Sequence, residues 1–169
     1  MNVKLFLIIF FIAAAAERML GTFGKKERDG EVFYRWVTKI LVVNYFVIAF
    51  CSLGEMIFFR GRINFTLVAI GFFCYITGAL LRRSTMKALG PNWSVHTKIY
   101  ADHQLIKTGP YKILRHPYYI AVLLELTGLS LIYNSIAGII LTYCVQLPFL
   151  LYRIPKEENT LINKFGEKY

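Results

Sequence analysis

Two short clusters hold the groups with which this chain could bind a polar ligand or carry out chemistry. The first contains Gly109–Tyr111 and Arg115–Tyr119, which read GPY and RHPYY, and the second is Arg153–Glu158, which reads RIPKEE. Together they offer guanidinium, imidazole, phenol and carboxylate groups, which can hydrogen-bond to both anions and cations. A long apolar stretch separates the two clusters. The pattern therefore predicts a polar site at a membrane surface, suited to a ligand that carries both positive and negative groups.

The elements that must position these clusters are apolar helices. Of the 169 residues, 56% are hydrophobic, and they gather in five long apolar segments. An α-helix needs about 20 such residues to cross the bilayer core, and the segments lack the period-2 alternation of barrel strands. We therefore predict an all-α integral membrane protein, a single domain over residues 1–169 with about five transmembrane helices. The segments are Val3–Leu20, Val37–Phe59, Ile63–Leu81, Tyr119–Tyr133 and Ile136–Ile154.

The basic residues predict how these helices are oriented. Across five alternating crossings, one side of the membrane receives only Lys4, Arg60 and Arg62, and the other 17 of the 20 lysines and arginines fall on the opposite side. The positive-inside rule then places the N-terminus outside, and the C-terminus and both polar clusters in the cytoplasm. The net charge of +10 fits basic loops that attract anionic lipid head groups, so no nucleic-acid partner is expected.

The first segment has a competing interpretation as a secretory signal peptide. Residues 1–16 carry one basic residue, an apolar core and small residues before Glu17. A cleaved signal would send the strongly basic side outward, so we expect an uncleaved first helix. The three cysteines, Cys51, Cys74 and Cys144, lie inside apolar segments without metal-ligand spacing and are expected to be small buried residues, so no metal site is expected.

The longest stretch outside the predicted helices runs from Arg82 to Pro117 and contains all three histidines. A loop of this length usually carries function. It leads into the fourth helix through Pro117, and proline suits the first turn of a helix. After Pro155, a separate amphipathic helix is predicted over Lys156–Phe165, with polar and apolar faces.

The fourth and fifth helices are expected to bring the two polar clusters together. Tyr133–Ser135 leaves room only for a tight turn, so these helices must be antiparallel neighbours. Taken singly, each polar residue has an ordinary explanation: arginines at a membrane face reach toward head groups, and glutamates favour the start of a helix. Taken together, they indicate a ligand site. The residues expected to converge are Arg115, His116, Tyr119, Arg153, Glu157 and Glu158.

Glu125 is a separate candidate, because it lies about two turns into the fourth predicted helix. A carboxylate inside a membrane segment is costly and is normally paired or functional. Two interpretations remain open: an ion pair with Arg82 or Arg83 in the interior of the bundle, or a place in an active-site cavity.

These motifs resemble those of the isoprenylcysteine carboxyl methyltransferase family, small membrane enzymes that methylate lipid substrates with S-adenosylmethionine. The family shows a loop that ends in Gly-x-Tyr, an Arg-His-Pro-x-Tyr signature, an apolar hairpin, an arginine–glutamate element and often a Phe-Gly-x-x-Tyr end. This chain matches them in order with His103–Tyr111, Arg115–Tyr119, Arg153–Glu158 and Phe165–Tyr169. The resemblance covers residues 82–169 and implies that this half binds the cofactor and catalyses, whereas residues 1–81 contribute three helices.

The resemblance implies that a cytoplasmic loop and the C-terminal helix close a pocket for S-adenosylmethionine that is not a Rossmann site, and the chain has no Gly-x-Gly-x-x-Gly motif. It places Arg153 on the substrate side. A phenolic acceptor, unlike a carboxylate, would also need a base, for which Glu125 and Glu158 are the candidates beside a histidine. Carried over residue by residue, the cofactor contacts fall on His96, His103, Gln104, Leu105, Ile106, Tyr111, His116, Pro117, Tyr118, Tyr119 and Glu157.

The methyl acceptor is left open. Histidine stands at His96, where the best-known eukaryotic members have glutamine, and the chain is shorter than theirs, so it looks more like the small bacterial members. A bacterial inner membrane is therefore expected, with an acceptor that is either the carboxylate of an isoprenylcysteine-like compound or the hydroxyl of a phenolic or pyrone lipid, reaching the site from the bilayer. Three alternatives are a phospholipid N-methyltransferase, a sterol-reductase-like enzyme that uses NADPH, and a non-enzymatic membrane scaffold.

Overall fold

The computed structural model describes residues 3–23, 31–33, 35–59, 63–94, 97–99 and 106–166. In this part of the chain, four helices precede a long composite rod. The helices are α1 (Val3–Phe23), α2 (Arg35–Phe58), α3 (Phe65–Leu89) and α4 (Pro117–Ile132). The rod consists of α5 (Ile136–Leu141), a π-helical segment (Thr142–Gln146) and α6 (Leu147–Phe165).

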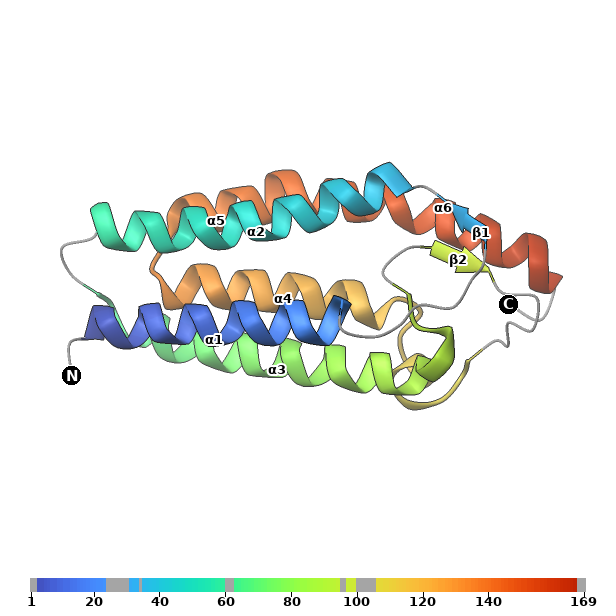
Figure 1. The fold of residues 1–169 in the computed structure, drawn as a ribbon, viewed down its shortest axis with the longest axis horizontal. Helices are drawn as coiled ribbons and strands as arrows, with labels where there is room; N and C mark the ends of the chain where they lie inside the picture. Colours follow the sequence, from blue (N-terminus) through green and yellow to red (C-terminus); the bar gives the residue numbers. More distant parts are fainter. Residues whose placement is uncertain are drawn as a thin grey trace.

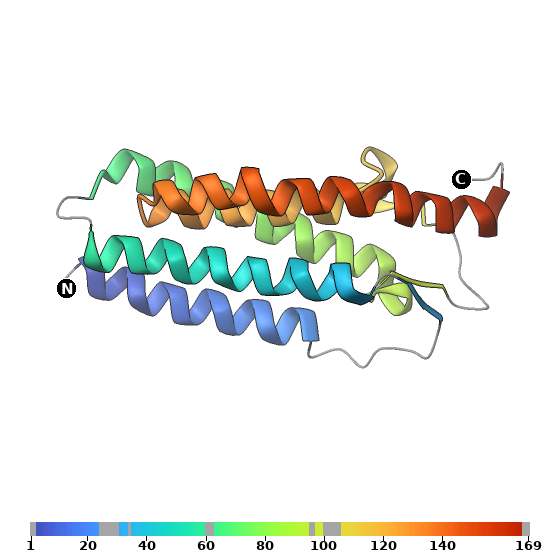
Figure 2. The same ribbon diagram turned by 90° about the horizontal axis from the view of Figure 1, so that it is seen from above.

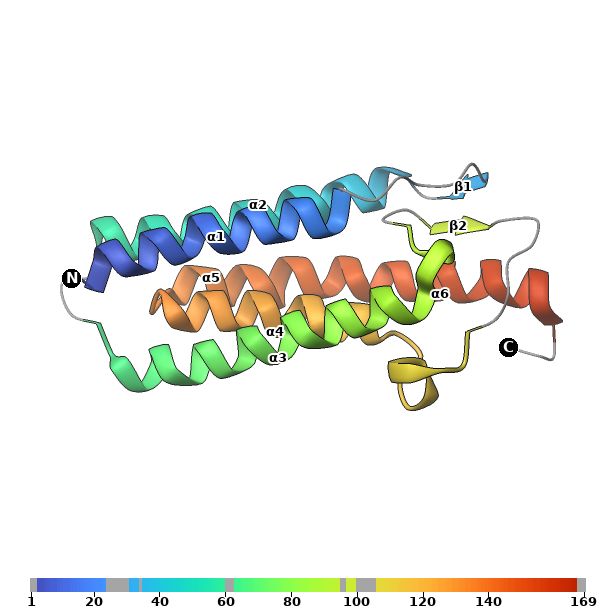
Figure 3. The same cartoon turned by 60° about the horizontal axis from the view of Figure 1, so that its bottom comes forward.

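The helices lie side by side in an elongated bundle with two different ends (Figure 1). One end holds the start of α1, the end of α2, the start of α3 and the turn from α4 to α5 (Figure 3). The other end, which we call the charged end, holds the end of α1, the start of α4 and the last turns of α6 (Figure 1 and Figure 2). Arg115 comes just before α4, and Arg153 and Glu157 lie in α6. Here β1 (Glu31–Phe33) pairs antiparallel with β2 (Thr97–Ile99), a short ribbon that the all-helical prediction did not include.

The closest helix pair is α3 with α4, which approach through glycines. A Cβ atom built on Gly71 would lie 2.6 Å from the backbone nitrogen of Ile132, and one on Gly128 would lie 2.5 Å from that of Tyr75. Gly78 meets the backbone of α4 in the same way, 2.8 Å from the nitrogen of Glu125. Small residues allow helix backbones to approach closely in membranes. This contact fixes where Glu125 lies relative to α3.

The turn that was predicted between the fourth and fifth helices is present. Asn134 adopts a positive φ of 53°, and the hydroxyl of Ser135 accepts a hydrogen bond from the backbone nitrogen of Gly138, capping α5. Glu55 on α2 accepts a hydrogen bond from the same hydroxyl at 2.7 Å, which ties the end of α2 to this turn. The prediction of Pro117 in the first turn of α4 is also confirmed.

Two predicted helix boundaries were wrong. α3 continues two turns past Leu81 to Leu89, because the following residues favour a helix until Gly90, whose φ is 52°, ends it. α6 runs through Pro155 to Phe165 without the predicted break. Pro155 is exposed, and so is Leu151, whose carbonyl loses its partner at this proline, so water can satisfy that oxygen where the helix leaves the bundle.

The outer surface of the bundle is apolar, as a membrane protein requires. In the part of the chain that the structure describes, three helical stretches are long and apolar enough to cross a bilayer: Arg35–Phe58, Phe65–Asn92 and Ile136–Lys164. Pro117–Ile132 is a shorter apolar helix. The chain is an integral membrane protein, and its five crossings and orientation remain predictions. The expectation that all three cysteines are buried was wrong, because Cys51 and Cys144 face outward, where a lipid environment suits small apolar residues as well as the interior does.

Candidate functional site

The two polar clusters meet at the charged end, as predicted. The Tyr119 hydroxyl donates a hydrogen bond to the Glu157 carboxylate, and His116 Nε2 lies 3.1 Å from Glu158 Oε1. Arg115 Nη1 lies 4.0 Å from the same oxygen of Glu158. The antiparallel packing of α4 against the rod therefore joins the start of α4 to the last part of α6.

Tyr119 lies at the centre of this cluster. It is only 7% exposed, and its ring stacks against that of His116 with centroids 5.5 Å apart and an interplanar angle of 9°. The guanidinium carbon of Arg153, a residue 8% exposed, lies 5.7 Å from the centroid of the Tyr119 ring. The buried cation of Arg153 and the carboxylate of Glu157 thus both contact Tyr119, the first at its ring and the second at its hydroxyl, and together they offer both charges to a ligand.

Tyr111 faces the same carboxylate from η2 (Gly109–Lys112), the short 3-10 turn before α4. Burial raises the pKa of the Tyr111 phenol above its usual range, and the negative charge of Glu157 raises it further. The phenol therefore stays neutral at physiological pH and can donate a hydrogen bond to an anionic group.

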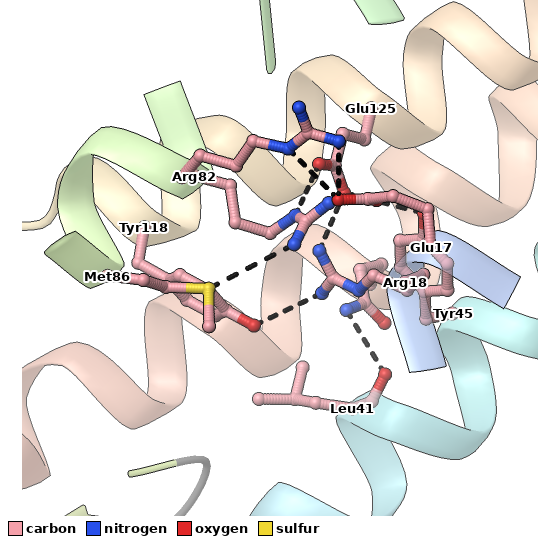
Figure 4. A network of polar contacts seen from close by, with 10 residues as sticks. Glu17, Arg18, Leu41, Tyr45, Arg82, Met86, Tyr118 and Glu125 are labelled. Carbon is pink, nitrogen blue, oxygen red and sulfur yellow. Dashed lines mark hydrogen bonds and ion pairs between the residues drawn. The ribbon is translucent and has the colours of Figure 1, made fainter. Parts of the chain in front are cut away.

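A second polar network lies deeper in the bundle, around Glu125 (Figure 4). Arg18 Nη1 of α1 donates to Glu125 Oε2 at 2.6 Å, and Arg82 Nε of α3 donates to Glu125 Oε1 at 2.7 Å. Arg82 also pairs with Glu17. Arg18, Arg82 and Glu125 are each at most 8% exposed. The ion pair with Arg82 that the sequence raised as one interpretation is present, and Arg18 adds a second one.

Aromatic side chains complete the surroundings of Arg18. Its guanidinium carbon lies 4.4 Å from the centroid of the Tyr45 ring, and its Nη2 lies 3.2 Å from the Tyr118 hydroxyl, to which it donates. Tyr118 in turn packs against Trp93, with ring centroids 4.7 Å apart. Arg18 thereby links α1 to both α2 and α4.

A pocket connects the two networks. Part of the pocket is open to the surroundings, and its walls are mainly apolar. Arg18 lies on one wall with a stretch of α2 from Thr38 to Phe46, and α4 and the composite rod form the opposite wall with Tyr119, Gln146 and Arg153.

The structure brings most of the described candidates together. Tyr118, Tyr119 and Arg153 line the pocket, and Glu157 contacts Tyr119. Pro117 is buried at the start of α4, and Ile106 is half-buried. The predicted cofactor contacts at His96, His103, Gln104 and Leu105 lie outside the described residues.

Sequence reasoning missed the contribution of α1 and α2 to the site. Arg18, Tyr45 and Thr38 line the pocket, yet they lie before the half of the chain that carried the motifs. One signal was available: Glu17 and Arg18 are adjacent charges inside an apolar segment, where charged residues are costly and usually functional or paired.

The fold and the site together define a class: a small helical membrane protein with a polar ligand site at one end of its bundle and a pocket that extends between its helices. Residues 67–163 match the model of the Isoprenylcysteine carboxyl methyltransferase (ICMT) family. Because this match covers more than half of the chain, the protein belongs to the ICMT family, whose enzymes use S-adenosylmethionine.

Curated relatives agree with this membership. The chain is 33% identical over 103 residues to a protein-S-isoprenylcysteine O-methyltransferase of Schizosaccharomyces pombe, a match over 60% of this chain and 43% of that protein. It is 30% identical over 117 residues to one of Dictyostelium discoideum, over 68% and 49% of the two chains. It is also 29% identical over 82 residues to the bacterial protein YpbQ of Bacillus subtilis, over 48% and 49%. The chain thus spans about half the length of these relatives.

Proposed function

We propose that the protein is a methyltransferase that moves a methyl group from S-adenosylmethionine to an oxygen atom of a lipid acceptor. The observation that carries this proposal is the contact between the two polar clusters, in which Tyr119, Glu157 and Arg153 lie beside a mainly apolar pocket. A water-soluble cofactor can approach such a site from the charged end, while a lipid tail lies between the helices.

The residues at the charged end fit the cofactor. S-adenosylmethionine carries an ammonium, a carboxylate, a sulfonium and an adenine ring. Glu157 can hold the ammonium, the neutral phenol of Tyr111 can donate to the carboxylate, and the stacked rings of His116 and Tyr119 offer a face to a cation or to adenine. When bound, the cofactor supplies an electrophilic methyl group on its sulfonium.

The chain's own contribution to the transfer is to position and orient the acceptor. Well-oriented reactants can lower a barrier by about 7–11 kcal/mol. The guanidinium of Arg153 would orient an acceptor carboxylate, which is already ionised and needs no base. A phenol with a pKa of about 10 must lose its proton, and Glu158, in contact with His116, is placed to accept it.

Glu125 is less suited to this proton transfer than Glu158. A guanidinium group donates a hydrogen bond to each of its two oxygens, so this buried carboxylate already serves two cations. The sequence left two roles open for Glu125, an ion pair in the bundle or a place in the active site. We assign it the ion pair.

An oxygen acceptor is favoured over the amine of a phospholipid. Arg18 and Arg153 both line the pocket, so a protonated head-group amine would meet two like charges there. An anionic or neutral oxygen acceptor is attracted instead. Whether that oxygen belongs to a prenyl-cysteine carboxylate, as in the names of the relatives, or to a phenolic lipid is a matter for direct assay.

Calorimetric binding of S-adenosylmethionine and of its demethylated product to the purified protein in detergent tests the cofactor site. We expect micromolar binding that Glu157→Gln abolishes, since the change removes the carboxylate that Tyr119 contacts. Glu55→Gln is the matched control, because it removes the same charge from the opposite end of the bundle, where Glu55 contacts Ser135. Unchanged affinity in the Glu157 variant would remove this residue from the site. Absence of binding in the folded wild-type protein would refute the proposed function.

A further inference from the structure

Two buried polar atoms on the pocket wall have no hydrogen-bond partner: Oγ1 of Thr38 and Oε1 of Gln146. The two side chains are only 2% and 1% exposed. Leaving such an atom unpaired costs about 1–3 kcal/mol, and the great majority of buried polar atoms in native proteins have a partner. Their position in the wall of a cavity indicates that the partner is a molecule bound there.

The hydroxyl of Thr38 differs from those of three other helical threonines. The hydroxyls of Thr85, Thr142 and Thr160 each donate to the carbonyl four residues earlier in their helix, at 2.8 Å. Thr38, in the first turn of α2, has no hydrogen-bond partner for its Oγ1 although this atom is buried. The hydroxyl therefore remains available to the pocket.

Gln146 faces the pocket as the last residue of the π-helical segment. Pro148, two residues later, cannot donate to a carbonyl in the preceding turn, and a wider turn accommodates it. Such π segments occur frequently at functional sites. The Nε2 atom of Gln146 donates to the Leu41 carbonyl at 3.4 Å, which leaves Oε1 to accept a hydrogen bond. A group that binds there must be a donor.

The two atoms belong to the same part of the pocket. Gln146 reaches the carbonyl of Leu41, and Thr38 lies one turn before Leu41 on the same face of α2. Arg153 is two turns further along the rod from Gln146, about 10 Å by helical rise. One lipid head can therefore contact Arg153 with one group and the Thr38–Gln146 pair with another.

We propose that Thr38 and Gln146 determine acceptor specificity by binding a hydrogen-bond donor of the lipid, a hydroxyl or an amide N–H, that is distinct from the oxygen receiving the methyl group. This inference rests on the proposed function and deepens it, because it names a second polar group that the acceptor must carry. A site built to bind a polar group discriminates strongly against an analogue that lacks it, since its buried atoms are then left unpaired.

Two matched pairs of lipids test the inference. N-acetyl-S-farnesylcysteine and S-farnesyl-3-mercaptopropionic acid share a carboxylate and a prenyl chain, but only the first has an amide N–H. Likewise, 5-pentadecylresorcinol has a second hydroxyl that 3-pentadecylphenol lacks. With labelled S-adenosylmethionine, we expect the donor-bearing member of at least one pair to have a kcat/KM about tenfold or more above its partner's, the worth of one buried hydrogen bond.

Variants identify the residues responsible. Thr38→Val and Gln146→Leu should bring the ratio within a pair close to one, because each removes one of the two groups that bind the donor. Thr142→Val is the matched control: it removes a buried hydroxyl that bonds only within its own helix, so the ratio should be unchanged. Equal kcat/KM values within both pairs in the wild-type protein would overturn the inference while leaving the methyltransferase proposal intact.

A binding measurement decides the matter if none of the four lipids is methylated. Donor-bearing lipids should then raise the thermal unfolding temperature of the wild-type protein more than their partners do, and Thr38→Val should remove the difference. Equal shifts within each pair would show that the two polar atoms bind only water, and would overturn the inference. Binding of S-adenosylmethionine, measured separately, reports on the proposed function alone.

Discussion

The network around Glu125 gives a quantitative prediction about stability. Glu125→Gln keeps the shape of the side chain but removes the negative charge that two buried guanidinium groups share. Among the described residues, Arg82 retains Glu17, whereas Arg18 retains the Tyr118 hydroxyl and the faces of Tyr45 and Tyr118. Arg18 therefore becomes a buried cation without a carboxylate.

Removing one partner of a buried ion pair typically costs about 3–5 kcal/mol. The cation–π contact between Arg18 and Tyr45 is present in both proteins, so it does not change this difference in stability. For a chain of this size, each kcal/mol lowers the unfolding temperature by about 2–4 °C. We therefore expect Glu125→Gln to unfold roughly 6–20 °C below the unchanged protein.

A double-mutant cycle tests whether the charge on Arg18 is the cause. Arg18→Met removes this cation. In the Arg18→Met, Glu125→Gln double variant, the guanidinium of Arg82 still pairs with Glu17, so no buried guanidinium is left without a carboxylate. The double variant should be more stable than the two single losses predict, by about 2 kcal/mol or more. The assay is thermal unfolding in detergent, followed by circular dichroism. A Glu125→Gln variant within about 2 °C of the unchanged protein, or additive single losses, would refute the reasoning.

Three further predictions concern the charged end and the α3–α4 contact. Arg153→Ala should lower turnover much more than S-adenosylmethionine affinity, because Arg153 is assigned to the acceptor; an equal loss of both would contradict that role. Tyr119→Phe removes the hydroxyl that donates to Glu157. Because a hydrogen bond to a charged group contributes about 1.5–3 kcal/mol, the change should weaken cofactor binding by about 10- to 100-fold in calorimetry. Unchanged affinity would place Tyr119 outside the site. Gly128→Ala should cost about 1–3 kcal/mol in thermal unfolding, because the added Cβ meets the α3 backbone, whereas Gly54→Ala, with nothing within 4 Å, should be neutral or slightly stabilising; equal effects would argue against the close packing.

The sequence predicted the helices, the tight turn before α5 and the meeting of the two clusters, because apolar length and antiparallel connection determine all three. It also suggested a pair between Glu125 and either Arg82 or Arg83, since a carboxylate in an apolar segment needs a cation, and the structure has Arg82 as the partner. Two helix boundaries were wrong. α3 runs past its predicted end to Leu89, because helix-forming charged residues extend it. α6 continues through the predicted break at Pro155, because an outward-facing proline is tolerated at the end of a bundle.

The pocket was beyond the reach of sequence reasoning. Its first wall comes from Arg18 and from α2, including Thr38, and its opposite wall comes from residues more than 70 positions later, including Gln146. Such distant residues become neighbours only through helix packing. The unpaired atoms of Thr38 and Gln146 carry no signal in the sequence, since pairing depends on which groups the packed helices bring near them.

The bundle joins its helices in two mechanically different ways. α3 and α4 meet backbone to backbone at glycines, so no side chain between them can change rotamer to let them slide. α1 instead meets its neighbours through rings, such as Phe10 against Phe72 and Phe11 against Phe50, and through the ion pairs of Arg18. Rings and guanidinium groups can reorient about their side-chain torsions. Within a bilayer, α3 and α4 would therefore move as one stiff unit, and a bulky lipid would make room for itself more easily by displacing α1 and α2 than by separating α3 from α4.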